Sequence, residues 1–222
     1  EKLKSQLADL SGERRGHVAI ACSQALLPHF LPEQISAYRA EHPAVTISVN
    51  RRDRAAAEQA LLDHDADLAL VFEPVRLADF QTLLTVRQPL HAVFPRGHPL
   101  EGEGPVRLRE CLAHPVALPT EAYGVRHILA AALRRSSLEL RPAVESDSFE
   151  FLRRLAAAEP IVTFQIPIGL DPATPDEAHR PVDPRDAPPG LLYMGQLRGR
   201  TLPIAAARFA DLLSREMSAR FE

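Results

Sequence analysis

Strand-like and helix-like stretches alternate along most of this chain, and the alternation limits the folds open to it. Short apolar runs at residues 17–22, 45–49 and 66–72 are separated by stretches of helical spacing at 26–41 and 54–63. The run at 66–72 is uninterrupted, which is typical of a parallel strand buried on both faces. Strands that alternate with helices in this way predict an open parallel α/β sheet with helices on both sides.

A second set follows a strand at 90–94 and a turn-rich break at 95–105. Further strands are predicted at 116–118, 141–144, 161–164 and 191–194. Three helices have apolar faces, formed by Val125, Ile128, Leu129, Ala132 and Leu133, by Phe149, Leu152, Leu155 and Ala156, and by Ala206, Phe209, Ala210, Leu213 and Met217. Asp147-Ser148-Phe149-Glu150 has the spacing of a capping box. With 222 residues, the two sets predict two lobes, each with its own core.

Prolines mark the places where regular structure is interrupted. Residues 171–190 hold six prolines, and because proline donates no backbone hydrogen bond, we predict that this segment is extended or irregular. We interpret it as a surface loop rather than a partner-binding motif. Pro28 and Pro32 predict an irregular start to the helix at 26–41. Asp53 is the predicted N-cap of the helix at 54–63.

The charge and composition of the chain argue against several classes of protein, among them DNA-binding and membrane-spanning proteins. The formal net charge of -3 leaves no excess of positive charge to neutralise a nucleic-acid backbone, so this chain alone is not expected to bind DNA. No apolar run approaches the roughly 20 residues that cross a bilayer, and no signal-peptide core is visible. We therefore expect no membrane contact and a cytoplasmic location. Cys22 and Cys111 form no disulfide framework and no CxxC pair, so we interpret both as structural, with a reactive thiol at Cys22 as the alternative.

The sequence carries no sign of an enzyme or a metal centre. It contains no GxSxG, HExxH, P-loop or GxGxxG motif, and its nine histidines show no metal-ligand spacing. We therefore expect no catalysis, no metal and no cofactor. His29 lies near a predicted strand end and is interpreted as a structural histidine.

Several phrases far apart in the chain are more specific than this general pattern. The early ones are Leu31-Pro32, Ile35, Tyr38, Pro43 and Val45, followed by Leu61-Leu62-Asp63 and Asp67-Leu68-Ala69-Leu70-Val71. The later ones are Gly97-His98-Pro99-Leu100, Glu145-Ser146-Asp147-Ser148-Phe149, Leu192-Tyr193-Met194, Arg198-Gly199-Arg200-Thr201-Leu202-Pro203 and Arg208-Phe209-Ala210-Asp211-Leu212-Leu213. In order and spacing they resemble the effector-binding portion of LysR-type transcriptional regulators. Glu159-Pro160 departs from that family, which usually has a glycine pair there, and the proline-rich segment is longer than expected.

The resemblance implies two Rossmann-like lobes joined by two crossovers, as in type II periplasmic binding proteins. Lobe I would hold residues 16–93 and 195–222, and lobe II residues 94–194. Residues 1–15, with a stripe of Leu3, Leu7 and Leu10, would be the end of a linker helix; a helix docked on its own domain is the alternative. DNA would be bound only through a winged helix-turn-helix domain that is absent from this chain. The family also implies a homodimer, paired through a helix and strand edge of lobe I, and a tetramer for the full-length protein.

A ligand is expected where parallel strands end, because backbone N–H groups and helix N-termini meet there. Ser23-Gln24-Ala25 follows the first strand, and Pro119-Thr120-Glu121-Ala122-Tyr123 holds the equivalent place in the second lobe. Two helix starts with hydroxyl donors favour an anion, so we predict a small carboxylate as the effector, bound between the lobes. Helix capping by Ser23 and Thr120 is the alternative. Regulators that the chain resembles contact effectors at these positions.

Other residues would complete such a site. Phe72, Phe164 and Gln165 close later strands and would form an apolar wall with a polar tip. Arg54, at the start of a helix, could pair with a carboxylate, although a solvated surface arginine is the simpler interpretation. Glu121 conflicts with an anion site, and either suits an effector with an amine or points to solvent.

The sequence thus favours an effector-sensing domain. The alternatives are a solute-binding protein of a transport system and an enzyme with the same fold.

Overall fold

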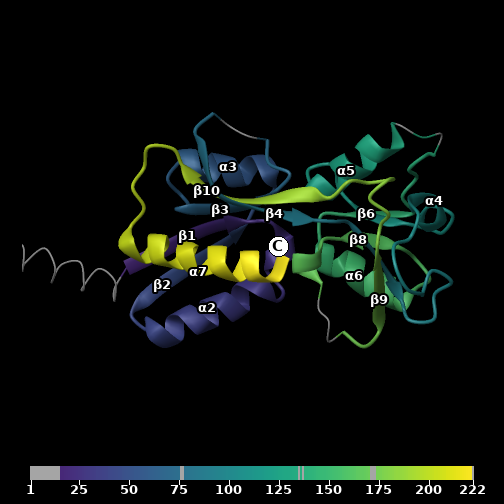
Figure 1. The fold of residues 1–222 in the computed structure, drawn as a ribbon, viewed down its shortest axis with the longest axis horizontal. Helices are drawn as coiled ribbons and strands as arrows, with labels where there is room; N and C mark the ends of the chain where they lie inside the picture. Colours follow the sequence, from purple (N-terminus) through teal and green to yellow (C-terminus); the bar gives the residue numbers. More distant parts are fainter. Residues whose placement is uncertain (1–15, 76–77, 135, 137, 171–173, 222) are drawn as a thin grey trace, which may run out of the picture. The chain divides into compact units, whose positions relative to one another are not determined.

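The computed structural model describes residues 16–75, 78–134, 136, 138–170 and 174–221 (Figure 1). The helix predicted over residues 1–15 lies outside the described residues. The chain forms two compact units. Unit 1 combines the chain up to Val86 with the chain from Leu191 onward, and unit 2 is Arg87–Gly190.

Unit 1 is built on a five-stranded mixed sheet. Its order is β2-β1-β3-β10-β4, with bounds Gly16–Cys22 for β1, Val45–Arg51 for β2, Leu68–Phe72 for β3, Phe80–Gln88 for β4 and Gly190–Leu197 for β10. β1 runs parallel to β2 and β3, and all five residues of β3 are buried, as predicted. The prediction of a wholly parallel sheet is wrong, because β10 starts beside the end of β3, at the pair Leu192 and Phe72, and runs antiparallel to it. β4 was not predicted from the sequence.

Helices cover both faces of this sheet (Figure 1). α3, Arg54–Leu62, lies on one face, and α2, Phe30–Glu41, lies with α7, Ile204–Phe221, on the other. The Tyr38 hydroxyl donates to the Ala205 carbonyl at 3.1 Å, and the Tyr38 ring meets the Phe209 ring edge-on at 5.0 Å. The predicted apolar face of α7 is buried throughout, which confirms it.

Local sequence explains where these helices begin. The Asp53 side chain accepts the Ala56 N–H at 2.8 Å, so the predicted N-cap of α3 is confirmed. The helix predicted from residue 26 instead consists of a short 3-10 turn, η1, Gln24–Leu26, followed by α2 from Phe30. Pro32 falls in the first turn of α2, where its missing N–H leaves no intrahelical bond unmade. The irregular start predicted from the prolines is therefore confirmed.

The described residues of unit 2 form two small sheets. One of them is antiparallel, whereas parallel strands were predicted. Its elements are β5 His91–Pro95, α4 Leu108–Cys111, β6 Ala117–Pro119, α5 Gly124–Leu133, β7 Val144–Ser146, α6 Phe149–Ala158, β8 Thr163–Gln165, η2 Pro167–Gly169 and β9 Glu177–Pro181. β5 pairs antiparallel with both β8 and β9, whereas β6 and β7 are parallel. The Ser148 side chain accepts the Phe151 N–H at 3.2 Å and caps α6, in the segment where a cap was predicted.

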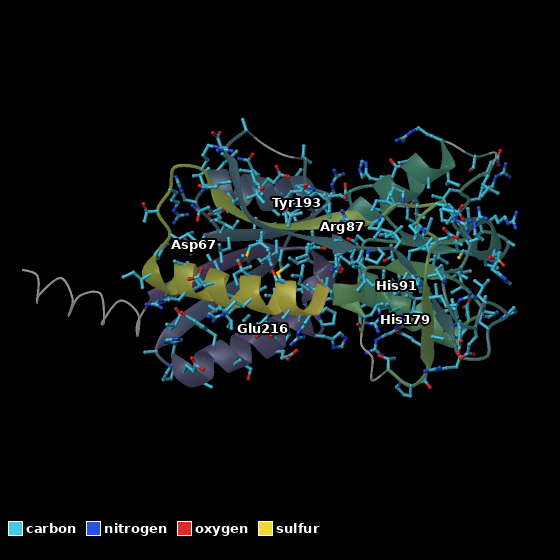
Figure 2. The ribbon with its side chains drawn as sticks, in the orientation of Figure 1. Asp67, Arg87, His91, His179, Tyr193 and Glu216 are labelled. Atoms are coloured by element: carbon cyan, nitrogen blue, oxygen red, sulfur yellow. The ribbon has the colours of Figure 1, made fainter. Side chains whose placement is uncertain are left out.

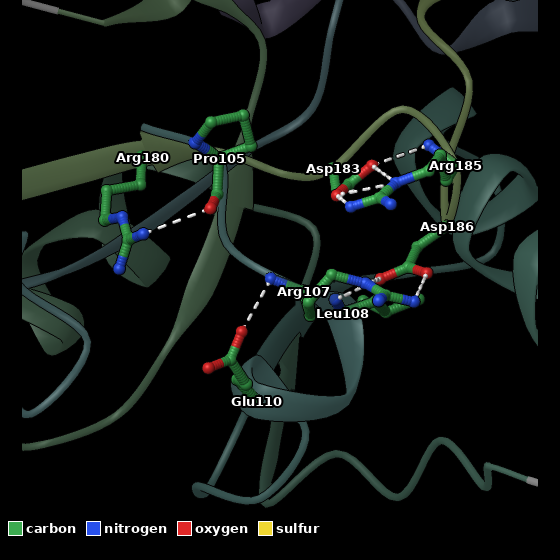
Figure 3. Close-up of polar contacts among 8 residues, drawn as sticks. All are labelled: Pro105, Arg107, Leu108, Glu110, Arg180, Asp183, Arg185 and Asp186. Carbon is green, nitrogen blue, oxygen red and sulfur yellow. Dashed lines mark hydrogen bonds and ion pairs between the residues drawn. The ribbon is translucent and has the colours of Figure 1, made fainter. Parts of the chain in front are cut away.

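The proline-rich segment is part of unit 2, so its interpretation as a surface loop is wrong for residues 174–190. β9 lies within it, and Val182 and Ala187 are each 2% exposed. Asp186 accepts two bonds from the Arg107 guanidinium, at 2.8 and 2.6 Å, and a third from the Leu108 N–H at 2.8 Å (Figure 3). The segment thus supplies an acceptor for the N–H of Leu108, the first residue of α4, which has no partner within its own helix.

An ion pair ties the start of β3 to the chain that follows β10. Arg200 donates from Nη2 to Asp67 Oδ1 at 2.9 Å and from Nη1 to the Ala66 carbonyl at 3.2 Å. The other oxygen of Asp67 accepts the backbone N–H of Ala19 in β1 at 2.9 Å. Gly199, with φ of 77°, forms the turn that presents Arg200, in a conformation that side chains disfavour. We call this contact between Asp67 and Arg200 the clasp.

We predict that Asp67→Asn lowers the free energy of unfolding by about 2 kcal/mol, because the amide keeps the size of the carboxylate but loses its charged hydrogen bonds. Chemical denaturation followed by circular dichroism measures the change. The matched control is Glu33→Gln, which removes the carboxylate of the more exposed Arg220–Glu33 pair in the same unit. That control should change stability by less than about 1 kcal/mol. Equal losses in the two variants would contradict a special role for the clasp.

Candidate functional site

In unit 1, Ser23 lies directly beyond the end of β1. Its N–H donates to the Leu70 carbonyl of β3 at 2.9 Å, and its carbonyl accepts the Leu26 N–H at 3.2 Å. The hydroxyl makes no capping hydrogen bond to η1, so the capping alternative is wrong for Ser23. Gln24 and Ala25 are 6% and 1% exposed. Ser23, which is half-buried, is therefore the member of this triplet whose side chain is most open to a ligand.

The helix that was expected to start at this point is not there. η1 has three residues and ends before α2 begins at Phe30. A single turn aligns too few peptide dipoles to make a strong anion site, so the argument from a helix N-terminus does not hold at Ser23. What remains at this strand end is the Ser23 hydroxyl. The carbonyl of the preceding residue, Cys22, accepts the N–H of Arg52, which lies between β2 and α3, at 3.0 Å.

Arg54 and Phe72 lie at the carboxyl ends of strands in the unit 1 sheet. Arg54 follows β2, and Phe72 is the last residue of β3. Arg54 is half-buried, and its Nε donates to the carbonyl of Glu73, the residue that follows β3, so the solvated-arginine interpretation is wrong. Glu73, which the sequence analysis missed, has φ of 52°, and its carboxylate accepts the Leu191 N–H at 2.7 Å. Phe72 is 4% exposed and serves as core. Arg54 and Glu73 therefore hold these strand ends in place.

In unit 2, the predicted residues follow β6. α5 begins at Gly124 with Tyr123 at its N-cap position, and no side chain caps it, so capping is not the role of Thr120. The Thr120 carbonyl accepts the Tyr123 N–H at 3.2 Å, and its side chain is half-buried. Tyr123 is 9% exposed, and its ring meets the Phe149 ring edge-on at 4.9 Å. Pro119 is buried as the last residue of β6. Thr120 is thus the half-buried hydroxyl of this segment.

Arg126 organises this strand end, and the sequence analysis missed it. Its Nη1 lies 2.7 Å from Glu145 in β7 and 3.3 Å from the Pro119 carbonyl, while its Nη2 lies 3.6 Å from Glu121. Glu121 is 88% exposed at its side chain, as the alternative of a solvent-facing carboxylate expects, and one of its oxygens lies near this guanidinium. Two carboxylates share one arginine here, which leaves the strand end slightly acidic. The partners lie 19 residues apart in sequence, and no periodicity indicated the pair.

Phe164 and Gln165 lie inside unit 2. They are 4% and 3% exposed, and Gln165 Oε1 accepts the N–H of the next residue, Ile166, at 2.9 Å. A Cβ on Gly169 would meet Gln165 Cδ at 2.8 Å, so glycine leaves the room that this amide fills. In this conformation the two residues form core rather than an exposed wall. The neighbour of Gln165 across the strand pair is His91 of β5.

His91 faces His179 of β9 across that sheet. Their Nδ1 atoms are 3.1 Å apart. Burial, reinforced by the neighbouring His179, lowers the pKa of His91 from 6.5 to about 4. Burial is also the main cause that lowers the pKa of His179. Both imidazoles are therefore neutral near pH 7.

The cysteines carry no reactive thiol. Cys22 and Cys111 are buried, and burial raises the pKa of each thiol to about 12. A thiol of that pKa is protonated at neutral pH and is a poor nucleophile, so the alternative of a reactive Cys22 is wrong. Within the described ranges, no group of three or more His, Cys, Asp or Glu side chains could hold a metal ion. The same ranges contain no helix long and apolar enough to span a membrane.

Comparison with known proteins gives a consistent result. The family model described as the LysR substrate binding domain matches residues 11–218. The HTH-type transcriptional activator CmpR of Synechocystis sp. is 22% identical over 154 residues, which are 69% of this chain and 50% of that protein. The HTH-type transcriptional regulator CbbR of Sinorhizobium medicae is 32% identical over 100 residues, 45% of this chain and 32% of that protein. The chain thus spans about half the length of CmpR.

Solved structures show the same fold. The regulatory domain of CcmR from Synechocystis PCC6803, in complex with 2-PG, matches with a TM-score of 0.78 at 19% identity, covering 93% of this chain and 99% of that chain. The effector binding domain of QuiR, in complex with shikimate, matches with a TM-score of 0.76 at 14% identity, covering 94% and 100%. These likenesses confirm the predicted fold class, that of LysR effector-binding domains.

We predict that His91, whose pKa is lowered mainly by burial and further by the neighbouring His179, makes the protein acid-sensitive. Between pH 6.5 and about 4 the unfolded chain binds a proton at His91 that the folded chain excludes, so the free energy of unfolding falls as the pH falls. From pH 7 to 4.5 the wild type should lose on the order of 2 kcal/mol more than His91→Gln. Urea denaturation at a series of pH values measures both slopes, and identical slopes would contradict the prediction.

Proposed function

Because the chain belongs to the family of LysR substrate-binding domains, we propose that it is the sensor of a LysR-type transcriptional regulator. It binds a small effector through residues at the carboxyl ends of its parallel strands. The observation that carries the proposal is the family match, which extends over residues 11–218. The structure adds half-buried hydroxyls, Ser23 and Thr120, directly after strand ends in both units.

We propose that the full-length regulator recognises DNA through a winged helix-turn-helix domain that is absent from this chain. CmpR, a transcriptional activator, is about twice as long as the region matched here. A net charge of -3 gives this chain no electrostatic attraction for a phosphate backbone. A cytoplasmic location agrees with action on DNA in a bacterium. We propose that effector binding shifts the population of pre-existing arrangements of the whole regulator, since a ligand acts only through its different affinities for them.

The charges near the two strand ends suggest the chemistry of the effector. In unit 1 the segment 51–54, where β2 ends and α3 begins, carries three arginines and one aspartate, which favours an anionic group near Ser23. In unit 2 the pair Glu121 and Glu145 around Arg126 favours a hydroxyl or an amine near Thr120. We therefore propose a small carboxylate that also bears hydroxyl or amino groups. Related domains solved with shikimate and with 2-PG support a small polar effector.

The other functions considered receive less support. The curated relatives include CmpR, CbbR and GltC, which are named as transcriptional regulators, and this favours regulation over solute transport. Their names also indicate regulators rather than enzymes. The sequence contains none of the catalytic motifs sought above that would indicate an enzyme.

We predict that Ser23→Ala and Thr120→Ala each weaken effector binding roughly tenfold, by removing one hydrogen bond worth about 1 to 1.5 kcal/mol. A thermal-shift screen of small carboxylates, with and without amino groups, first identifies an effector, because a ligand of the folded state raises the melting temperature. Calorimetry then measures the dissociation constants. The matched control is Thr82→Ala, which removes an exposed hydroxyl from β4. Unchanged affinity in both site variants would contradict the assignment.

We also propose that the chain forms a homodimer. β2 is at the edge of the unit 1 sheet, so one side of its backbone is open to pairing with a second copy, and α2 follows the neighbouring strand β1 in sequence. We propose this helix and strand edge as the dimer contact by resemblance to the family, and a tetramer for the full-length regulator.

Light scattering over a range of protein concentrations tests the dimer. A mass of twice 24.5 kDa is expected at high concentration. A mass that stays at one chain up to about 100 μM, a concentration at which a dimer with micromolar affinity would be populated, would contradict the proposal.

A further inference from the structure

His91 and His179 lie 88 residues apart in sequence and meet in unit 2. Figure 2 shows the two side chains close together. Their Nδ1 atoms are 3.1 Å apart, their ring centroids are 5.1 Å apart, and their planes make an angle of 57°. The sequence showed no metal-ligand spacing, because the two histidines come from different strands.

The backbone fixes this distance. β5 and β9 pair antiparallel over five residues, with His91 opposite Pro181 and His179 opposite Val93. The two histidines are diagonal neighbours on one face of the sheet, so their Cβ positions depend on strand pairing rather than on a loop. A ligand that needs both rings would find them already in place.

Two nitrogens bound to one late transition-metal ion at about 2.0–2.1 Å lie about 2.8–3.4 Å apart when the N–metal–N angle is between a right angle and the tetrahedral angle. The observed 3.1 Å falls in that range. Neutral imidazole is a preferred ligand of Zn²⁺, Cu²⁺ and Ni²⁺. We propose that His91 and His179 form a two-ligand site for such a divalent ion, whose remaining coordination positions are filled by water.

The surroundings are compatible with a cation. Partial burial lowers the pKa of both rings, so each is neutral at neutral pH and can carry its single proton on Nε2 and present Nδ1 to the metal. The arginines that affect His179 each contact a carboxylate, Arg153 with Glu177 at 2.6 Å and Arg96 with Glu101 at 3.2 Å. His179 is exposed and lines a hollow of about 180 Å³, which gives the ion and its water access.

The other close pair of histidines does not offer such a site. His98 and His114 have ring centroids 4.6 Å apart, but Nδ1 of His98 accepts the Leu100 N–H at 3.1 Å. That bond places the proton of the neutral ring on Nε2, so neither nitrogen of His98 is free to bind a metal. The competing explanation for His91 and His179 is a plain N–H···N hydrogen bond, which needs no metal.

Titration of tag-free, chelator-treated protein with Zn²⁺ at pH 7.5 tests the proposal, with Cu²⁺ electron paramagnetic resonance as a second readout. We expect one ion per chain and two coordinated nitrogens in the Cu²⁺ spectrum. His91→Gln and His179→Gln should each weaken Zn²⁺ binding at least tenfold. The matched control His127→Gln, an exposed histidine on α5, should leave it unchanged.

His179→Gln keeps the test decisive if His91→Gln fails to fold, because His179 is exposed. Absence of saturable binding below about 1 mM would leave only the N–H···N hydrogen bond and overturn the proposal. Equal loss of affinity in His127→Gln would show scattered surface binding and would overturn it as well.

Discussion

Unit 1 depends on the clasp between Asp67 and Arg200. The chain leaves unit 1 after β4, builds unit 2, and returns through β10, so its sheet is complete only when residues 133 positions apart come together. Asp67 joins three segments, because it accepts the N–H of Ala19 in β1, immediately precedes β3 and binds Arg200 beyond β10. Its side chain is 9% exposed, so a carboxylate without these donors would be costly to bury.

Asp67 and Arg200 belong to the phrases in which the chain resembles its family, although CmpR, CcmR and QuiR are only 22%, 19% and 14% identical to it. The phrases that carry the resemblance include Asp67 and the turn Arg198-Gly199-Arg200, which form this contact. Gly97, in another of the phrases, has φ of 78° in the turn after β5, and the buried His98 holds the Leu100 N–H. These residues contribute to the fold, and none of them belongs to the candidate site.

Much of the fold could be predicted from the sequence because periodic patterns reflect burial. The face of α7, the buried strand β3 and the caps of α3 and α6 depend on residues close together in sequence. β10 was placed correctly along the chain, but its antiparallel direction depends on how the chain returns from unit 2. β4 was overlooked because its solvent-facing side carries Leu83, which obscures the alternation. β9 was hidden by prolines, although Pro181 stands at the end of an edge strand, where its missing N–H costs nothing.

The candidate site was less accessible to such reasoning. Ser23 and Thr120 were placed at strand ends correctly, since that position depends on the order of elements. The helix expected at Ser23 was wrong, and Phe72, Phe164 and Gln165 are core. The contacts of Arg126 with Glu145 and of His91 with His179 join single residues on different elements, and no local pattern marks them.

Hydrogen exchange of backbone amides, with and without a saturating effector, tests most directly whether this chain senses a small molecule at its strand ends. The account predicts slower exchange at residues 23–26 and 120–126, where the ligand restricts local opening, and unchanged exchange at the core strand β3. Protection that avoids both strand ends, or a saturating effector that changes exchange nowhere in the chain, would contradict it.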